Sequence, residues 1–333
     1  MSEPAVRVEG LTKQFRVPRR RAGLRAAFKA LFRRETTDVL AVSELSFALQ
    51  PGERVGFLGP NGAGKTTTLK ILAGLLYPTA GQVQVCGYTP QTREHAFLRR
   101  ISLVMGQKRQ LSWDLPAVDT FELNRVVFEI EAATYRRRLD ELVQRLEIGA
   151  VMQQPVRTLS LGERMKCELA AALLHGPKVL FLDEPTLGMD VAMQLSLREF
   201  ICDYNQTYGA TIILTSHYME DVAALCPRLI VIDEGKLCFD GSIEALTRQI
   251  HPLRRVSVVA QTFPPADVLA ELGRVVDPDG PRLSLDVEPA RVPEAVGLLV
   301  NLPGSRNLEV RDSPLEEVMR ELFAHTKKSE TPS

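Results

Sequence analysis

Residues 59–66 read GPNGAGKT and directly follow the apolar run VGFL at 55–58. The spacing G-x-x-x-x-G-K-[ST] is typical of a loop between a strand and a helix in which successive backbone N–H groups turn towards one anion. Lys65 adds a point charge for the outer phosphates of a nucleotide, and Thr66 adds a hydroxyl for Mg²⁺. The motif therefore predicts an α/β fold with a helix from about Gly64, whose positive dipole end faces the same phosphates.

Composition limits the partners of the chain. Its 333 residues fit one large domain and one smaller one, and 45% hydrophobic residues supply a core. Because 41 basic residues balance 41 acidic ones, no overall field would collect nucleic acid, and we expect no such partner. No apolar stretch is long enough to span a membrane and residues 1–9 hold no apolar block, so we expect a cytoplasmic chain. The 5 cysteines lack a C-x-x-C spacing and are expected to be reduced, buried thiols.

Strands and helices alternate from 45 to 105 and again from 179 to 239. This alternation predicts a mostly parallel sheet with helices on both faces. Between the two stretches, residues 118–146 show a helical pattern without strands, and we expect an inserted helical subdomain at about 108–172.

The C-terminal part of the chain differs in character. Residues 256–311 follow the order β-α-β-β-α-β, and a further helix is expected at 314–324 before a polar end. The predicted domains are a nucleotide-binding domain at 1–250, an accessory α+β domain at 251–325 and a disordered tail at 326–333.

An insertion at 18–37 separates the first expected strand, at 6–8, from the strands that follow. Residues 19–34 combine apolar residues at helical spacing with many basic residues, which predicts a basic amphipathic helix. Such a helix fits the anionic surface of a membrane or a membrane subunit near the headgroups, or else packs its apolar stripe on its own domain. The apolar positions are Leu24, Ala27, Phe28, Leu31 and Phe32, and the basic ones are Arg19, Arg20, Arg21, Arg25, Lys29, Arg33 and Arg34.

Asp183 and Glu184 follow the apolar run at 179–182, at the C-terminal end of an expected strand. Ligands bind outside this end of the strands in open α/β sheets. Asp183 is suited to hold Mg²⁺, directly or through water, and Glu184 to orient and deprotonate an attacking water. A solvated acidic pair at a strand end is the alternative.

Residues 158–164, TLSLGER, open another expected helix. Ser160 is suited to cap this helix, and the free N–H groups around Gly162 make a second anion site. The segment is either an ordinary helix cap or part of a nucleotide site. Its position just upstream of the strand that ends at Asp183 favours the nucleotide site.

In this order, the motifs resemble those of the nucleotide-binding subunit of ATP-binding-cassette (ABC) transporters. The resemblance covers about residues 6–250. It implies an ABC-type P-loop ATPase domain with a mostly parallel sheet, an antiparallel β-subdomain and an inserted α-helical subdomain, followed here by the small α+β domain. The motifs are GPNGAGKT at 59–66, Gln107 after a strand, SLGE at 160–163, LDE at 182–184, Asp190 in a turn and TSH at 215–217.

The resemblance also implies ATP and Mg²⁺ as cofactors and a role for each matching residue. Phe15 would stack on adenine, with a core phenylalanine as the alternative. Glu184 would be the general base, Gln107 would sense Mg²⁺ and the attacking water, and His217 would contact the γ-phosphate and keep Glu184 in place. Lys65 would act in catalysis with them. The phosphates and Mg²⁺ would be held by Gly59, Pro60, Asn61, Gly62, Ala63, Gly64, Lys65, Thr66 and Thr67, with Thr66, Gln107 and Asp183 nearest the metal.

In this family two such domains sandwich two nucleotides, so the chain would form a homodimer or pair with a paralogue. Ser160 and Gly162 would reach the γ-phosphate of a nucleotide bound to the second copy, and Asp190 would lie at the dimer junction. The family signature usually reads SGGQ. Here Leu161 removes some backbone freedom, and Glu163 brings a negative charge near the phosphate unless it points away. We expect an active but slower site.

A separate membrane-spanning subunit would supply the transport path, with this chain peripheral on the cytoplasmic face of the inner membrane. Residues 106–116 match a GQ-x-x-x-L-x-W-D-L-P segment that looks like that of exporter ATPases. Trp113 is then either a contact for the partner or a core residue. An importer ATPase and a soluble ABC ATPase acting on a non-membrane partner are the alternatives. No residue identifies the cargo, and the C-terminal domain is open to regulation, dimer support or stabilisation.

Overall fold

A computed structural model of the chain describes residues 3–18, 36–106, 110–277 and 282–329. The chain forms two compact units, residues 1–240 and 241–333. The expected boundary lay after residue 250, whereas in the structure helix α9 (Ile243–Ile250) belongs to the second unit. The reason is packing, because α9 contacts α12 (Leu315–Ser329) of that unit.

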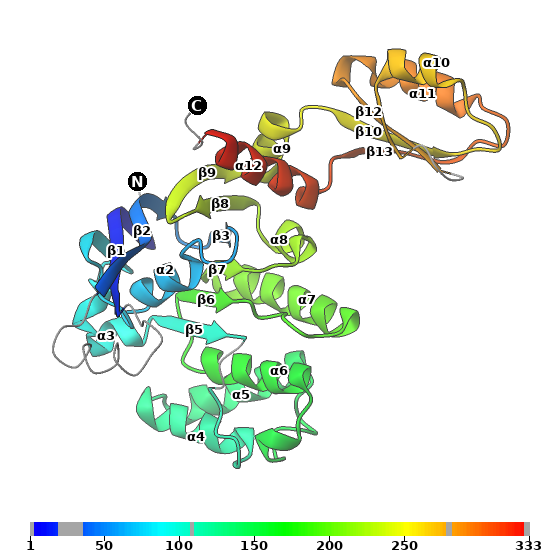
Figure 1. The fold of residues 1–333 in the computed structure, drawn as a ribbon. Helices are drawn as coiled ribbons and strands as arrows, with labels where there is room; N and C mark the ends of the chain where they lie inside the picture. Colours follow the sequence, from blue (N-terminus) through cyan, green and yellow to red (C-terminus); the bar gives the residue numbers. More distant parts are fainter. Residues whose placement is uncertain (1–2, 19–35, 107–109, 278–281, 330–333) are drawn as a thin grey trace, which may run out of the picture. The chain divides into compact units, whose positions relative to one another are not determined.

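The centre of the first unit is a sheet with the strand order β5-β6-β7-β3-β8-β9 (Figure 1). Its strands from β5 to β8 run parallel to one another. The central strands are buried along nearly their whole length, as their continuous apolar sequences predicted. In sheet order the strands are Ile101–Met105, Val179–Asp183, Thr211–Thr215, Arg54–Leu58, Arg228–Asp233 and Lys236–Ser242.

An antiparallel sheet in the order β2-β1-β4 shares one apolar cluster with this parallel sheet. Its strands are β1 (Val6–Pro18), β2 (Thr36–Leu49) and β4 (Ala80–Val85). The first strand is much longer than the three residues expected from sequence, because its outer half is polar and pairs with β2 through β-bulges. The basic amphipathic helix predicted at 19–34 lies outside the described residues.

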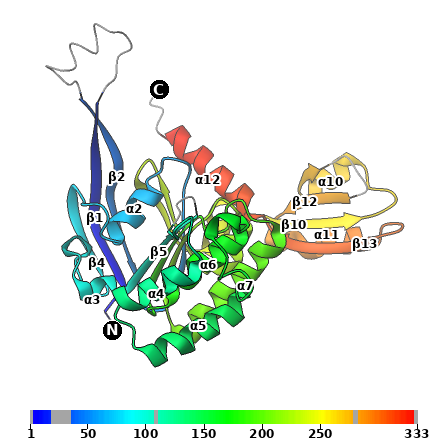
Figure 2. The same cartoon turned by 90° about the horizontal axis from the view of Figure 1, so that it is seen from below.

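Helices α4 (Ala117–Val127), α5 (Ala132–Leu146) and α6 (Leu161–Leu173) form a helical block that follows β5 (Figure 2). The sequence pattern did not reveal the break between α4 and α5. At this break Glu129 has a positive φ of 49°, and Glu131 caps α5 by accepting from two backbone N–H groups. The other helices of the first unit are α2 (Lys65–Leu72), α3 (His95–Leu98), α7 (Val191–Tyr208) and α8 (Met219–Leu225).

The second unit contains an antiparallel sheet in the order β11-β12-β10-β13, with its own apolar cluster. Its elements follow the predicted order β-α-β-β-α-β. Helix α12 continues to Ser329, so a disordered tail from 326 is wrong for its first residues, which include good helix formers such as lysine. The elements are β10 (Arg254–Val259), α10 (Ala266–Leu272), β11 (Arg274–Asp277), β12 (Arg282–Val287), α11 (Val292–Val300) and β13 (Arg306–Asp312).

The structure also bears on two expectations drawn from composition, which concern the cysteines and membrane-spanning segments. The cysteines are free thiols, but only Cys167 and Cys226 are buried as expected, whereas Cys86, Cys202 and Cys238 are half-buried. Burial raises the pKa of Cys167 and of Cys226 to about 12, so both act as small apolar groups. Within the described ranges, the helices are all too short or too polar to cross a membrane.

Candidate functional site

The loop between β3 and α2 turns tightly because glycines allow close backbone contacts. A Cβ on Gly59 would lie 2.2 Å from the carbonyl oxygen of Ile232, and one on Gly64 would lie 2.3 Å from that of Ala41. Gly62 and Gly64 also have positive φ values of 85° and 100°. The loop is therefore seated against strands β8 and β2, and α2 begins directly after it.

Lys65 is the first residue of α2, and the loop encloses its ammonium group. The Nζ atom donates to the carbonyl oxygens of Gly59 at 2.6 Å and Pro60 at 3.0 Å. Burial lowers the pKa of Lys65, and the nearby carboxylates of Glu184 and Asp183 oppose that shift. The ammonium thus lies between the loop and the acidic end of β6, where it is suited to bind phosphate.

Asp183 ends β6 and accepts hydrogen bonds from two threonine hydroxyls. Thr66 Oγ1 donates to Oδ2 at 2.9 Å, and Thr215 Oγ1 donates to Oδ1 at 2.7 Å. Thr215 ends the neighbouring strand β7, so the strand pairing brings the two groups together. Hydroxyl and carboxylate oxygens are ligands that suit Mg²⁺, which keeps waters and phosphates as its other ligands. Thr66 and Asp183 therefore fit a magnesium site, and Thr215 is a supporting residue that the sequence analysis did not select.

Glu184 and His217 are in contact, with Nε2 of His217 2.9 Å from Oε1 of Glu184. The backbone of Glu184 has a positive φ of 54°. Its N–H donates to the carbonyl oxygen of Thr215 at 3.0 Å and to the hydroxyl at 3.1 Å. Non-glycine residues held in this conformation concentrate at functional sites. The structure brings together the two residues for which sequence analysis predicted a joint role.

Gly106, the residue before Gln107, packs directly against the C-terminal end of β6. A Cβ on Gly106 would lie 2.1 Å from the carbonyl oxygen of Glu184, and the Gly106 N–H donates to the carbonyl oxygen of Asp183 at 2.9 Å. Gln107 itself lies outside the described residues. Strand β5 therefore ends beside Asp183 and Glu184, but the predicted role of Gln107 stays a prediction.

Phe15 lies on β1, where it pairs with Val39 of β2. The Nζ atom of Lys13 is 4.9 Å from the centre of the Phe15 ring, a cation–π contact. Two residues beyond Val39, Ala41 touches the phosphate-binding loop at Gly64. One strand pair thus carries Phe15 and contacts the loop, and the stacking of Phe15 on adenine stays a prediction.

Ser160 is the N-cap of α6, and Glu163 completes a capping box around it. The Glu163 Oε2 atom accepts from the Ser160 N–H at 2.8 Å and from its hydroxyl at 2.7 Å. The Glu163 N–H donates back to Ser160 Oγ at 3.3 Å. The hydrogen bonds from Ser160 lower the pKa of Glu163. The Glu163 carboxylate therefore points towards Ser160 at the start of α6, because the positive end of this helix and the two donors on Ser160 hold it in that position.

The residues after Ser160 pack against the turn before α7. A Cβ on Gly188 would lie 2.8 Å from Cδ2 of Leu161, and a Cβ on Gly162 would lie 2.6 Å from Cγ of Met193. Asp190 caps α7 by accepting from the Met193 N–H at 2.9 Å. The signature segment and the turn predicted at the dimer junction are thus in contact within one chain.

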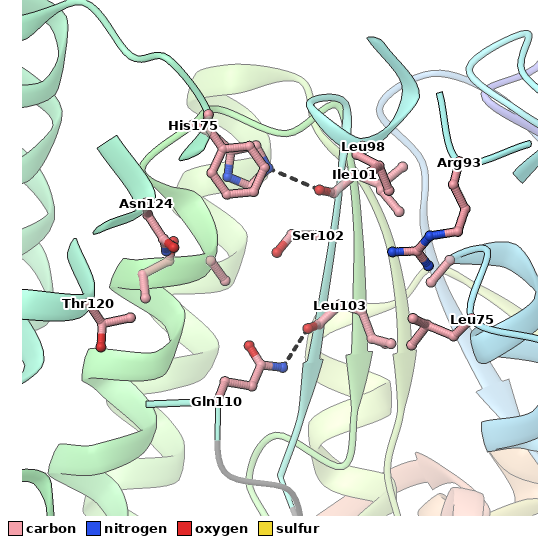
Figure 3. A pocket seen from close by; sticks show the side chains of 14 residues that line it. Leu75, Arg93, Leu98, Ile101, Ser102, Leu103, Gln110, Thr120, Asn124 and His175 are labelled. Atoms are coloured by element: carbon pink, nitrogen blue, oxygen red, sulfur yellow. Dashed lines mark hydrogen bonds between the residues drawn. The ribbon is translucent and has the colours of Figure 1, made fainter. Parts of the chain in front are cut away.

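A cavity of about 290 Å³ is lined by residues of β5 and of the helical block (Figure 3). Ser102 and Leu103 line it from β5, and Asn124 lines it from α4. Gln110, on the segment that follows Gln107, donates from Nε2 to the carbonyl oxygen of Leu103 at 2.6 Å. The cavity therefore lies along the first three residues of β5.

His175 borders the same cavity and is held as a structural residue. Its Nε2 atom lies 3.0 Å from the carbonyl oxygen of Ile101, and its ring stacks on Phe128 with centroids 4.0 Å apart. Burial lowers the pKa of His175 to about 4, so the imidazole is neutral near pH 7. These contacts give His175 a role in packing β5 against the helical block.

Comparison with known proteins identifies the family. The ABC transporter family profile matches residues 42–187. Nod factor export ATP-binding protein I of Ralstonia nicotianae is 34% identical over 250 residues, which is 75% of this chain and 71% of the relative. Daunorubicin resistance ATP-binding protein DrrA3 of Streptomyces coeruleorubidus is 32% identical over 293 residues, 86% of this chain and 91% of the relative. A solved ATP-binding subunit of an ABC transporter has the same fold, with a TM-score of 0.61, 23% identity and coverage of 74% and 92%. The chain therefore belongs to the ABC transporter family, among its ATP-binding subunits.

Proposed function

We propose that this ATP-binding subunit hydrolyses ATP to drive export through a separate membrane subunit. The observation that carries the proposal is the contact between Glu184 and His217, 2.9 Å apart, beside Asp183 at the end of β6. A carboxylate held by an imidazole next to a phosphate-binding loop is suited to remove a proton from an attacking water.

Each residue of the site has a separate task in this mechanism. Lys65 and the loop N–H groups bind the β- and γ-phosphates, while Thr66 and Asp183 hold Mg²⁺. The metal, when bound, supplies positive charge that neutralises the phosphate oxygens. Glu184 accepts the proton of the water, and His217 keeps the carboxylate oriented towards it. We assign to Gln107 the sensing of Mg²⁺ and the attacking water.

Hydrolysis in this proposal requires two copies of the ATP-binding unit. Ser160 and Gly162 of one copy close over the γ-phosphate held by the other. Support comes from the packing of Leu161 on Gly188 and of Gly162 on Met193. Because of these contacts, a movement of the signature segment also moves the turn that contains Asp190. The second copy is this same chain or a paralogue.

The export role rests on the relatives and on an exposed apolar surface of the segment before α4. The two relatives reported above are named for Nod factor export and daunorubicin resistance. On the segment that precedes α4, Trp113 is 38% exposed and Leu115 is 47% exposed, which makes an apolar surface available. We assign this surface to the membrane subunit, which places the chain on the cytoplasmic face of the membrane. Contact of residues 19–34 with anionic lipid is part of the same proposal.

The test uses the native complex, purified together with its membrane subunit. We expect Glu184→Gln to lower kcat for ATP by at least about 100-fold, since the general base is lost, while ATP binding is kept. Ser160→Arg is expected to abolish turnover and also to spare ATP binding. Glu199→Gln is the matched control, because Glu199 is exposed on α7. Normal hydrolysis by Glu184→Gln would contradict the mechanism, and a complex without a membrane subunit would contradict the transport role.

A further inference from the structure

The carboxylate of Asp221 in α8 is completely buried, with 0% exposure, and three other segments of the first unit reach it. The guanidinium of Arg198 pairs with Oδ1. The hydroxyl of Thr186 donates to Oδ2, and that of Ser216 donates to the same oxygen at 3.3 Å. One buried carboxylate is therefore held by a cation and two hydroxyls.

Two of these segments carry Glu184 and His217, the two residues in contact at the candidate site. Thr186 is two residues after Glu184, and Ser216 directly precedes His217. Ser216 Oγ also accepts from the N–H of Tyr218 at 3.0 Å, so both neighbours of the histidine are held. The hydrogen bonds to Asp221 thus fix the backbone just after Glu184 and on both sides of His217.

The third contact of the Asp221 carboxylate is an ion pair with Arg198, which lies on α7. Arg198 is 13% exposed and supplies the counterion that a buried carboxylate needs. Helix α7 begins after Asp190, which caps it through the Met193 N–H. Asp221 therefore joins the helix that starts at the proposed dimer junction to the two segments that carry Glu184 and His217.

We propose that Asp221 is a positioning residue that holds Glu184 and His217 in mutual contact, an inference that rests on the proposed ATP hydrolysis. The groups assigned to ATP binding, Lys65 and Thr66, lie on another element, α2. Loss of the Asp221 contacts should therefore lower kcat and leave the KM for ATP nearly unchanged. Misplacement of a reacting group by less than its own diameter is enough to slow a proton transfer.

The mildest test is Thr186→Val, which removes one hydroxyl and keeps the shape of the side chain. We expect kcat to fall about threefold to tenfold, the range for one lost hydrogen bond, with the KM for ATP within about twofold of wild type. Ser216→Ala should act in the same direction. Asp221→Asn should lower kcat further, and its folding is checked by circular dichroism. If Asp221→Asn does not fold, Thr186→Val and Ser216→Ala decide the question.

A double-variant cycle separates positioning from general stability. If Asp221 acts through the contact of His217 with Glu184, Thr186→Val should slow the wild-type enzyme but not the His217→Ala variant. Independent effects would multiply instead. Multiplying effects, or wild-type kcat in both Thr186→Val and Ser216→Ala, would overturn the inference. Wild-type chain that hydrolyses no ATP in its complex would overturn the proposed function and this inference with it.

The second unit supplies matched controls. Ser257 and Ser284 share a buried hydroxyl contact of 2.9 Å, so Ser257→Ala also removes one buried hydrogen bond. Asp286 is 3% exposed and pairs with Arg255, which also pairs with Glu317, so Asp286→Asn also removes one carboxylate partner of a largely buried arginine. Both controls should lower stability and leave kcat unchanged. A loss of kcat in these controls as large as that in Thr186→Val and Asp221→Asn would show an effect of stability alone and overturn the inference.

Discussion

The carboxylate of Glu163 accepts hydrogen bonds from both the backbone N–H and the hydroxyl of Ser160, at 2.8 and 2.7 Å. The same hydroxyl is proposed to reach the γ-phosphate of a nucleotide on a second copy. A carboxylate in that place repels the phosphate, since both are negative, and it already accepts the hydrogen bond of the Ser160 hydroxyl. Closure of the two copies must therefore move or outcompete Glu163.

Glu163→Gln is expected to raise the ATPase rate of the native complex by about threefold to tenfold. Glutamine keeps the capping box, since it accepts from the Ser160 N–H, but it removes the negative charge. The measurement is the steady-state ATPase rate at low ionic strength, where the effect of the charge is largest. An unchanged or slower rate would show that Glu163 serves only the helix.

Glu131→Gln is the control for this prediction. Glu131 caps α5 by accepting from the N–H groups of Ala133 and Thr134, both at 2.8 Å. The substitution therefore changes the same chemistry at a helix start that is not assigned to the nucleotide. We expect at most a small loss of stability, about 0.5–1 kcal/mol, and an unchanged ATPase rate.

Gly106→Ala is expected to disturb the end of β6. The added methyl would lie 2.1 Å from the carbonyl oxygen of Glu184, so the backbone that orients this carboxylate must shift. We expect a stability loss of about 1–3 kcal/mol in urea denaturation and a fall in kcat that exceeds any change in KM. Gly297→Ala is the contrast, because nothing lies within 4 Å of its added methyl in α11. That change should stabilise the chain by about 0.5–1 kcal/mol.

Thr215→Val is expected to weaken the response to Mg²⁺. The hydroxyl of Thr215 donates to Asp183 at 2.7 Å, and its loss frees a carboxylate that we assign to the metal. We expect the half-maximal Mg²⁺ concentration for hydrolysis to rise about threefold to tenfold. Thr211→Val, at the other end of the same strand, removes a hydroxyl that accepts from Gly52 and should leave this concentration unchanged. Equal effects of both substitutions would argue against the assignment.

Protonation of His175 should make the first unit less stable in mild acid. Burial lowers its pKa to about 4, below its usual value of 6.5, so the unfolded chain binds the proton more tightly than the folded one. The stabilisation is complete above about pH 6.5 and is lost as the pH falls towards 4. Between pH 7 and pH 5 this residue should account for about 2 kcal/mol of the unfolding free energy.

Urea denaturation of His175→Phe at both pH values checks this prediction. The variant keeps an aromatic ring against Phe128 but has no proton to gain, so its stability should depend less on pH than that of wild type. The substitution also removes the contact with the carbonyl oxygen of Ile101, so lower stability at pH 7 is expected. His95 is exposed, and His95→Gln should keep the wild-type pH dependence. A His175→Phe variant with the wild-type slope would contradict the prediction.

Sequence patterns located the fold and most of the candidate site because these features are local. The loop at 59–66 needs glycines at particular backbone angles, and its flanking strand and helix are adjacent in the chain. The acidic pair after 179–182 is visible for the same reason, as a change from apolar to charged residues at a strand end. The outer half of β1, with Lys13 and Gln14, gave no such signal, because its pairing with a distant segment, not its composition, makes it a strand.

The phosphate-binding loop, the alternation of strands and helices and the family resemblance could all be predicted from the order of residues in the chain. Three side-chain contacts became visible only in the folded chain. Thr215 donates to Asp183, Ser160 donates to Glu163, and Asp221 accepts from Thr186, which is thirty-five residues away. Hydroxyl and carboxylate groups carry no periodic pattern that reveals their partners. Those partners are chosen when strand pairing and burial remove water and leave each polar group only the neighbours that the fold provides.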